Sequence, residues 1–281
     1  MFSSMNGNHL VRGGNNMYEA ERKQRILELL KVNQRVDVQG LNQILHVSES
    51  TIRRDLKELE ESNLLKRTHG GAIPLHNVNY EPSFLEKEVS SGEQKKAIAK
   101  KAAALIREGE VILLDSGTTM VCLAKELRRF NKLTVVTNAV PVAQELLAHD
   151  GIELILLGGT MRKDILSLVG PFAEQMLSML HVDKAFIATN GIHPTEGLST
   201  PNITEASIKR RMIDSSKKVI LLADSSKISE IKHVKFAGLS DIDTFITDDG
   251  AQEDMLSEFA SRGLELHIVT SEEKQGKIEA V

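Results

Sequence analysis

Six polar side chains lie close together in the sequence with the chemistry and the spacing of a nucleic-acid contact. They are the cations Arg53, Arg54 and Lys57 and the hydroxyl residues Ser48, Ser50 and Thr51. Guanidinium and hydroxyl groups hydrogen bond to base edges and to phosphate oxygens. The cations interleave with the apolar series Ile52, Leu56 and Leu59, so they lie on the other face of a helix. The pattern predicts a helix that reads DNA.

Two short helices must position these groups. The first is predicted by one apolar face made of Val38, Leu41, Ile44 and Leu45. Ser48 can cap the second helix at its N-terminus. Only His46 and Val47 separate the two patterns, and Val47 is apolar enough to fill the corner. Two helices that meet at so tight a turn form a helix-turn-helix, here residues 36–55, whose second helix enters a major groove.

A basic hairpin is expected directly after these helices. The sequence Leu-Leu-Lys-Arg at 64–67 is followed by Thr-His-Gly-Gly at 68–71. This pattern predicts a β-wing with a glycine tip. We expect Lys66, Arg67 and His69 to lie along the DNA backbone. A charged helix face alone more often only faces water. Here the turn spacing, the cap, the arginine pair and the wing occur together, and this combination favours DNA binding.

From residue 93 onward, short apolar strands alternate with amphipathic helices. We expect strands at 111–114, 133–136, 153–157, 184–188, 219–222, 244–246 and 264–269. We expect helices at 93–107, 120–129, 142–148, 172–180, 204–215 and 252–262. Buried strands joined by crossover helices predict an α/β domain with a mainly parallel, doubly wound sheet.

Polar residues follow most of these strands, at the edge where ligands of such sheets bind. The strand ends carry Asp115, Ser116, Gly117, Thr118 and Thr119, then Thr137 and Asn138, Gly158 and Gly159, Asn190 and Gly191, and Asp224 and Lys227. Glycine permits close backbone approach and helix N-terminal amides attract anions, so the first loop suits a phosphate. One such end is often only a turn, but five at one edge favour a pocket. Arg162 and Lys163 either add charge there or face the solvent.

The DNA-binding half resembles a known family. Ser-x-x-Thr-Ile-Arg-Arg-Asp-Leu at 48–56, followed by His-Gly-Gly-Ala at 69–72, is similar to the DeoR/GlpR family of bacterial transcription regulators. The resemblance extends to about residue 249. It implies a winged helix-turn-helix domain that is completed by a first helix at 18–32.

The same resemblance implies a sensor domain similar in fold to ribose-5-phosphate isomerase, which binds phosphorylated sugars. The loop at 116–119 matches the family's phosphate loop, and 224–227 matches its closing Asp-Ser-Ser-Lys. The segment at 198–206 matches the part that closes over the ligand. This match adds the effector-binding candidates Asn202, Glu205 and Lys209. Residues 166–175 resemble the amino-sugar branch of the family.

The resemblance implies a repressor of a sugar or amino-sugar catabolic operon that a phosphorylated sugar releases from operator DNA. The alternative is a phosphosugar isomerase with an appended DNA-binding domain. Related isomerases carry an Asp-Gly-x-Asp turn near the substrate, and the comparable turn here, residues 189–192, has no carboxylate. Asp115, Glu205 and Asp224 remain as candidate bases.

The 281 residues are enough for one or two domains. We expect a disordered leader at 1–16, a DNA-binding domain at 17–73, a linker at 74–92, a sensor domain at 93–270 and a polar tail at 271–281. Within the linker, Phe84, Leu85 and Val89 predict a short docked helix.

Composition excludes several other classes. The single cysteine, Cys122, allows no internal disulfide, and no metal-ligand spacing or dinucleotide-binding motif occurs, so we expect no metal and no cofactor. No apolar run approaches the roughly 20 residues that span a bilayer. We therefore expect a cytoplasmic, nucleoid-associated protein without a membrane partner.

Charge bears on the assembly. The chain has a net charge of −4, whereas the stretch from Tyr18 to His69 has ten Lys or Arg and nine Asp or Glu, a net charge of +1. A module with so small a positive charge binds DNA weakly by itself. We therefore expect a homo-oligomer, a dimer or a tetramer, that pairs several modules on repeated half-sites.

Overall fold

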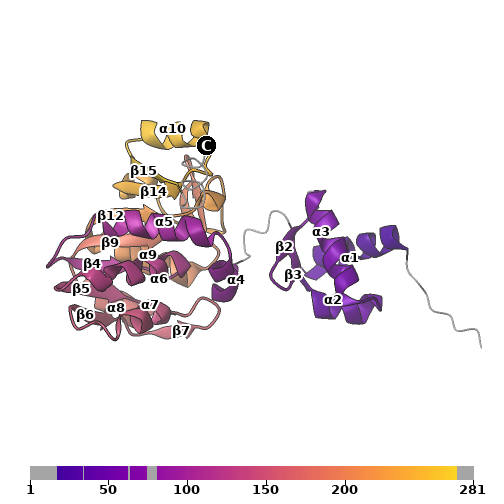
Figure 1. Cartoon of the computed structure of the whole chain (residues 1–281), viewed down its shortest axis with the longest axis horizontal. Coiled ribbons are helices and arrows are strands. Elements are labelled where there is room, and N and C mark those ends of the chain that lie inside the picture. The colour runs from indigo at the N-terminus through magenta and orange to yellow at the C-terminus, as the bar shows by residue number, and fades with distance from the viewer. Residues whose placement is uncertain (1–17, 34, 63, 75–80, 271–281) are drawn as a thin grey trace, which may run out of the picture. The chain divides into compact units, whose positions relative to one another are not determined.

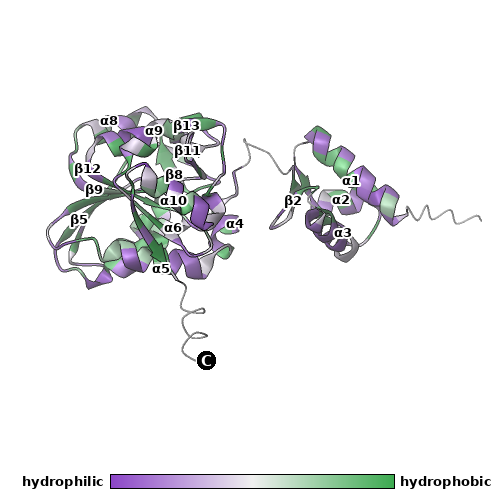
Figure 2. Ribbon diagram, turned by 90° about the horizontal axis from the view of Figure 1, so that it is seen from above, coloured by the Kyte–Doolittle hydropathy of each residue, from purple (hydrophilic) through white to green (hydrophobic). Residues whose placement is uncertain are grey.

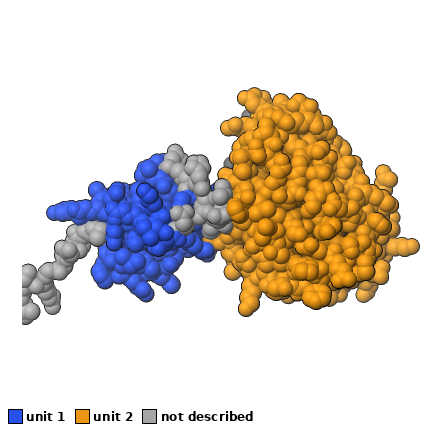
Figure 3. Space-filling view, turned by 180° about the vertical axis from the view of Figure 1, so that it is seen from behind, with its two compact units in different colours: residues 1–77 blue, residues 78–281 orange. Residues whose placement is uncertain are grey.

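The computed structural model describes residues 18–33, 35–62, 64–74 and 81–270. The chain divides into two compact units, residues 1–77 and 78–281, which Figure 3 shows in different colours. The expected leader at 1–16, the expected tail at 271–281 and part of the expected linker, 75–80, lie outside the described residues. None of the described helices is both long and apolar enough to cross a membrane.

The first unit is a helix-turn-helix with a small antiparallel sheet (Figure 1). Its helices are α1 (Glu19–Asn33), α2 (Val38–Leu45) and α3 (Glu49–Glu61), and its strands are β1 (Val36–Asp37), β2 (Lys66–Thr68) and β3 (Gly71–Ile73). The strands pair in the order β1-β3-β2, and β2 and β3 form the predicted wing. A single apolar cluster from all three helices, which includes Ile26, Leu41, Ile52 and Leu65, holds the unit together.

Local hydrogen bonds define the turn between α2 and α3. Asp37 caps α2 by accepting a bond from the amide of Gly40 (2.7 Å). His46 ends α2 in the left-handed region, with φ of 53°. Val47 packs against the core as expected. The prediction that Ile44 belongs to the apolar face was wrong: its side chain is 52% exposed, because the buried face of this short helix is complete without it.

A buried ion pair joins α1 to α3, and the sequence analysis did not anticipate it. Arg22 donates two hydrogen bonds to Asp55, from Nε (2.5 Å) and from Nη2 (2.9 Å). Their side chains are only 7% and 0% exposed. The pair orients α3 against α1 from inside the core.

The second unit contains a seven-stranded sheet in which every pairing is parallel. Its order is β15-β14-β12-β9-β4-β5-β6. The strands are β4 (Val111–Leu114), β5 (Leu133–Thr137), β6 (Ile152–Leu156), β9 (Val182–Ala188), β12 (Ser216–Leu222), β14 (Thr244–Asp248) and β15 (Glu265–Val269). The chain winds outward from β4 through β6 and then returns to β9 on the other side of β4. The β4/β9 boundary is therefore the switch point, where such sheets bind ligands.

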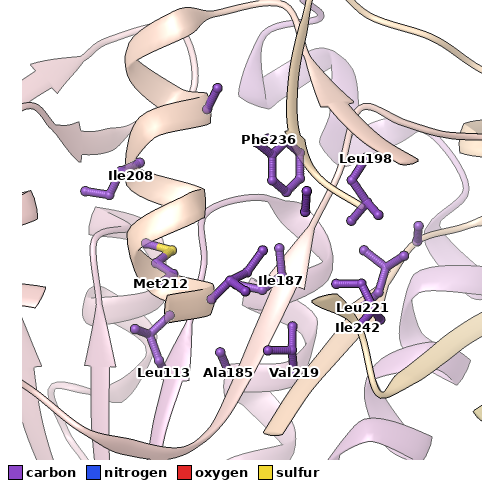
Figure 4. Packing of buried hydrophobic residues seen from close by; sticks show 14 of the residues in the cluster. Leu113, Ala185, Ile187, Leu198, Ile208, Met212, Val219, Leu221, Phe236 and Ile242 are labelled. Atoms are coloured by element: carbon purple, nitrogen blue, oxygen red, sulfur yellow. The ribbon is translucent and has the colours of Figure 1, made fainter. Parts of the chain in front are cut away.

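Alternate strand residues face opposite sides of the sheet, and each side is covered by helices. One face packs on α5 (Gly92–Ala103), α6 (Thr118–Glu126) and α7 (Val140–Leu146). The other packs on α8 (Pro171–Ser178), α9 (Ile203–Asp214) and α10 (Glu253–Ser261). Figure 4 shows Ile208 and Met212 of α9 beside Leu113 and Ile187 of the strands. In Figure 2 the strands of the sheet are largely hydrophobic, whereas the helices carry both hydrophilic and hydrophobic residues. The predicted doubly wound sheet is confirmed.

Several elements escaped prediction. A separate antiparallel sheet joins β10 (Gly191–His193), β11 (Gly197–Thr200) and β13 (Val234–Ala237), and β7 (Thr160–Arg162) forms a hairpin with β8 (Ser167–Val169). Short 3-10 turns at Ser225–Lys227 and Leu239–Asp241 were not predicted either, whereas the one at Leu127–Arg129 forms the end of the helix expected at 120–129. These pieces are too short to show a clear hydrophobic period.

Part of the expected linker, residues 74–92, is folded. Helix α4 (Phe84–Val89) forms inside it, capped by Ser83, and belongs to the second unit. The amide of Phe84 donates to the carbonyl of Asp164 (2.7 Å). The expectation that Leu85 and Val89 dock was wrong, since both are 70% exposed. The helix is held by backbone and charged contacts instead.

Candidate DNA-binding and ligand-binding sites

The outer face of α3 presents the cations that the sequence singled out. The side chains of Arg53, Arg54 and Lys57 are 52%, 61% and 63% exposed. Each lies near an acid one turn further along or back on α3: Arg53 with Glu49 (3.5 Å), Arg54 with Glu58 (4.0 Å) and Lys57 with Glu61 (3.6 Å). Exposed pairs of this kind are weak, about 0.3–0.5 kcal/mol each. A phosphate can therefore take over these cations at little cost.

The hydroxyl groups cluster at the start of the same helix. Ser48 caps α3 by accepting a bond from the amide of Thr51 (3.3 Å), and its Oγ lies 2.8 Å from Ser50 Oγ. In the wing, Lys66, Arg67 and His69 are exposed. The amide of Arg67 donates to Glu60 (2.7 Å), which ties the wing to α3.

A pocket lies at the switch point of the sheet, at the edge where the sequence analysis expected a ligand to bind. It encloses a cavity of about 60 Å³. Nine predicted effector residues line it: Ser116, Gly117, Thr118, Thr119, Asn190, Glu205, Lys209, Asp224 and Lys227. They come from the ends of β4, β9 and β12 and from α9. Residues far apart in the sequence thus meet here.

The loop after β4 has the geometry of an anion site. Gly117 adopts φ of 124°, a conformation that L side chains rarely adopt, and it precedes the first turn of α6. The amides of a first helical turn have no partner within the helix and carry its positive end. Ser116 of this loop and Thr118 and Thr119 of the first turn of α6 carry hydroxyl groups, and all three residues line the pocket.

A buried ion-pair chain runs beneath this loop. Lys209 Nζ contacts Asp115 (2.5 Å) and Glu205 (3.3 Å), and Arg162 contacts the other oxygen of Glu205 (3.0 Å). Burial disfavours the ionised form of Glu205, but Lys209, Lys87 and Arg162 outweigh it and hold the pKa of Glu205 below its usual range. Burial likewise opposes the charge of Lys209, yet Asp115 and Glu205 raise its pKa. Glu205 and Lys209 are therefore both charged at neutral pH.

The sequence analysis missed the wall that the supposed linker supplies. Phe84, Lys87 and Ser90, from α4 and its end, line the pocket, as does Lys95 of α5. Ile165, in the turn between β7 and β8, lines it as well. No local pattern marks these residues, because a lysine on an amphipathic helix looks like any surface lysine. The buried Asp115 lies just outside the lining, where it also accepts the amides of Ser116 (2.7 Å) and Ala188 (3.0 Å).

Besides Asp115, six predicted effector residues do not line the pocket. They are Thr137, Asn138, Gly158, Gly159, Gly191 and Asn202. Their polar groups serve the fold: Thr137 accepts from the amide of Ala139 (3.1 Å), and Asn138 donates to Leu168 (3.0 Å). Asn202 caps α9 through the amides of Thr204 and Glu205. A Cβ on Gly159 or Gly191 would meet backbone oxygens at 2.6 and 2.3 Å, so both glycines permit close packing.

Other expected features are simple to place. Cys122 lies on α6, half-buried, and burial raises the pKa of its thiol. Across the described ranges, no three His, Cys, Asp or Glu side chains gather in a way that could hold a metal ion.

Comparison with known proteins agrees with this two-part architecture. Residues 22–78 match the DeoR-like helix-turn-helix domain, and residues 90–249 match the DeoR C terminal sensor domain. The chain belongs to the DeoR family. It is a DNA-binding transcription regulator, as the sequence analysis predicted.

DeoR-family relatives are similar along most of this chain. The HTH-type transcriptional regulator GlpR of Haloferax volcanii is 41% identical over 88% of this chain and 97% of its own length. A putative aga operon transcriptional repressor of Escherichia coli O157:H7 is 34% identical over 89% and 94%. Among solved structures, ribose 5-phosphate isomerase A from Methanocaldococcus jannaschii is similar over 48% of this chain and 53% of its own, at 18% identity and a TM-score of 0.35.

Proposed function

We propose that this DeoR-family regulator represses a sugar or amino-sugar catabolic operon and that a phosphorylated sugar bound in the sensor pocket relieves the repression. The observation that carries the proposal is the switch-point pocket. There an α6 N-terminus, three hydroxyl residues and the cations Lys87, Lys95 and Lys227 meet in one small cavity. Such a set of donors suits a phosphate monoester.

On the DNA side, α3 is the recognition helix. Arg53, Arg54 and Lys57 contact the operator, while Ser48, Ser50 and Thr51 set the register and contribute to base selection. Lys66, Arg67 and His69 of the wing lie along the backbone. The exposure of the cations and the weakness of their pairs within α3 support these roles.

The regulator acts as a homo-oligomer. The stretch from Tyr18 to His69 has a net charge of only +1, so the affinity of a single unit is low and salt-sensitive. Two or more units on repeated half-sites raise the affinity through effective concentration. The protein works in the cytoplasm on the nucleoid, and it needs no metal or cofactor.

The sensor domain does not isomerise its ligand. A catalytic base must accept a proton from the substrate. Asp115 and Glu205 are each paired with the buried ammonium of Lys209, and Asp224 accepts the amide of Ser226 (3.1 Å). The candidate carboxylates are therefore engaged by the protein itself, which favours a binding role over the isomerase alternative.

Regulation follows from differential affinity. If the phosphorylated sugar binds the DNA-incompetent state more tightly, it shifts the population from the operator. A tenfold preference requires only about 1.4 kcal/mol. One charge-assisted hydrogen bond to the phosphate, about 1.5–3 kcal/mol, is enough to supply it.

Two measurements on the full chain test this proposal. A thermal-shift screen of phosphorylated sugars should reveal a ligand that adds about 2.7 kcal/mol at ~100 times its Kd. The matching unphosphorylated sugar is the control and should not stabilise the protein. The same ligand should dissociate the protein from a fragment of its own promoter in a mobility-shift assay. Isomerised product after incubation, abolished by Glu205→Gln, would establish the enzyme alternative instead.

A further inference from the structure

Main-chain carbonyls at the end of α4 occupy donors that a phosphate would use. Lys95 Nζ donates to the carbonyl of Lys87 and to that of Ser90 (2.6 Å). The hydroxyl of Thr118, on the first turn of α6, also points to the carbonyl of Lys87 (3.4 Å). Lys95 is only 5% exposed, and all four residues line the pocket.

These carbonyls are poor partners for a buried ammonium group. Burial lowers the pKa of Lys95, and Asp224, the principal nearby acid, only partly offsets it. Neutral carbonyl oxygens accept hydrogen bonds from the ammonium group but do not compensate its positive charge, whereas a phosphate dianion does both. An incoming phosphate therefore competes well for Lys95.

The enclosed part of the pocket is also small. Its 60 Å³ hold only a few water molecules, since each needs about 10–15 Å³ by the same measure. Phe84, Lys87 and Ser90 form one wall. Because the opposite side is the edge of the parallel sheet, the α4 wall is the part able to give way.

Strained backbone flanks that wall. Ser91, between α4 and α5, has φ of 51°, and Leu166, next to the pocket residue Ile165, has φ of 54°. Residues other than glycine in this region store strain, which concentrates at ligand clamps and switches. Just before α4, the largely buried pair Glu81–Arg162 (2.8 Å) connects the chain to the β7–β8 hairpin.

We propose that Lys95 is a phosphate-binding residue of the sensor pocket. In the unliganded protein, carbonyl groups at the end of α4 accept the hydrogen bonds that Lys95 would donate to the phosphate. When the ligand binds, Lys95 and Thr118 donate to its phosphate instead of to the carbonyls at the end of α4. Helix α4 then moves away from the pocket wall. In the sequence, α4 is the first described helix after the DNA-binding domain, so its release carries the ligand signal toward that domain. This inference rests on the phosphorylated ligand class of the proposed function.

Hydrogen–deuterium exchange on the full chain tests the competition, with inorganic phosphate as the probe. Thermal shift first establishes the concentration at which phosphate stabilises the protein. At that concentration, amides of residues 84–91 should exchange at least about tenfold faster, because they lose charge-assisted bonds. Amides of residues 117–120 should exchange more slowly. Sodium chloride at equal ionic strength is the control.

A matched pair of variants separates Lys95 from general charge effects. Lys95→Met removes the ammonium but keeps the length of the side chain. Residues 84–91 should then exchange fast without phosphate, and phosphate should bind at least about tenfold more weakly. Lys96→Met is the control on the same helix, because Lys96 is 68% exposed and lies outside the pocket lining. It should behave as the unaltered chain.

The outcomes discriminate. Stabilisation by phosphate with unchanged or slower exchange at 84–91 overturns the inference and leaves the pocket intact. An absence of phosphate binding, together with an absence of binding by every phosphorylated sugar, overturns the proposed function and the inference with it. Because the phosphate experiment uses the unaltered chain, it decides the question even where Lys95→Met does not fold.

Discussion

Replacement of Arg22 by methionine should unfold the DNA-binding unit while it leaves the sensor domain folded. Arg22 makes both hydrogen bonds to the fully buried Asp55 of α3. Without it, a carboxylate remains inside the cluster formed by Ile52, Leu56 and their neighbours, and no solvent reaches it.

The magnitude decides the outcome. Loss of one partner of a buried ion pair costs about 3–5 kcal/mol, because the other charge remains buried. At about 0.05–0.15 kcal/mol per residue, the folded part of this unit, residues 18–74, has a free energy of unfolding of only roughly 3–9 kcal/mol. Much of the DNA-binding unit should therefore be unfolded in Arg22→Met.

Calorimetry and promoter binding provide the assay. The unfolding transition of the DNA-binding unit should move to a lower temperature or vanish in Arg22→Met, promoter binding should fall, and ligand stabilisation of the sensor domain should persist. Arg25→Ala is the matched control, since the Arg25–Glu28 pair is exposed and worth about 0–1 kcal/mol. The double variant Arg22→Met, Asp55→Leu should recover most of the stability. Normal melting and promoter binding in Arg22→Met alone would refute this reasoning.

Three further predictions concern the two sites. Arg53→Ala should weaken promoter binding by about 1–3 kcal/mol in filter binding with unfolding unchanged; unaltered affinity would remove Arg53 from the interface. Thr118→Val should leave a repressor whose promoter complex resists the effector, and a normal response would place the phosphate elsewhere. Glu205 ionises below its usual 4.5, so its contribution is complete above that pH and lost on acidification; Glu205→Gln should flatten the acid limb of urea-unfolding stability, and an unchanged limb would contradict this.

The sequence predicted the larger elements because hydrophobic periodicity reports long helices and buried strands directly. All seven strands of the parallel sheet and the helix-turn-helix lie where their patterns place them. The β10-β11-β13 sheet was not predicted, because three- and four-residue strands carry too few alternations. Ile44 shows a second limit of hydrophobic periodicity: the helix was predicted correctly, but the tertiary fold leaves this apolar residue exposed.

The pocket was predicted from its strand ends and, for Glu205 and Lys209, from the family resemblance. Residues such as Ser116 and Asp224 follow apolar runs, so topology places them at one edge. Lys87 and Lys95 became visible only in three dimensions, because their role depends on how α4 folds back on the sheet. Conversely, Thr137 and Asn138 lie at the end of β5 as expected, yet they bond to the amide of Ala139 and to the carbonyl of Leu168 in β8.

Fluorescence anisotropy of a labelled promoter fragment tests the central claim most directly. The fragment is titrated with the full chain, with and without a phosphorylated sugar that stabilises the protein in thermal shift. The account predicts that this ligand raises the apparent Kd for the promoter at least about tenfold, a change of about 1.4 kcal/mol. Promoter affinity that stays constant while the ligand saturates the sensor pocket would contradict it.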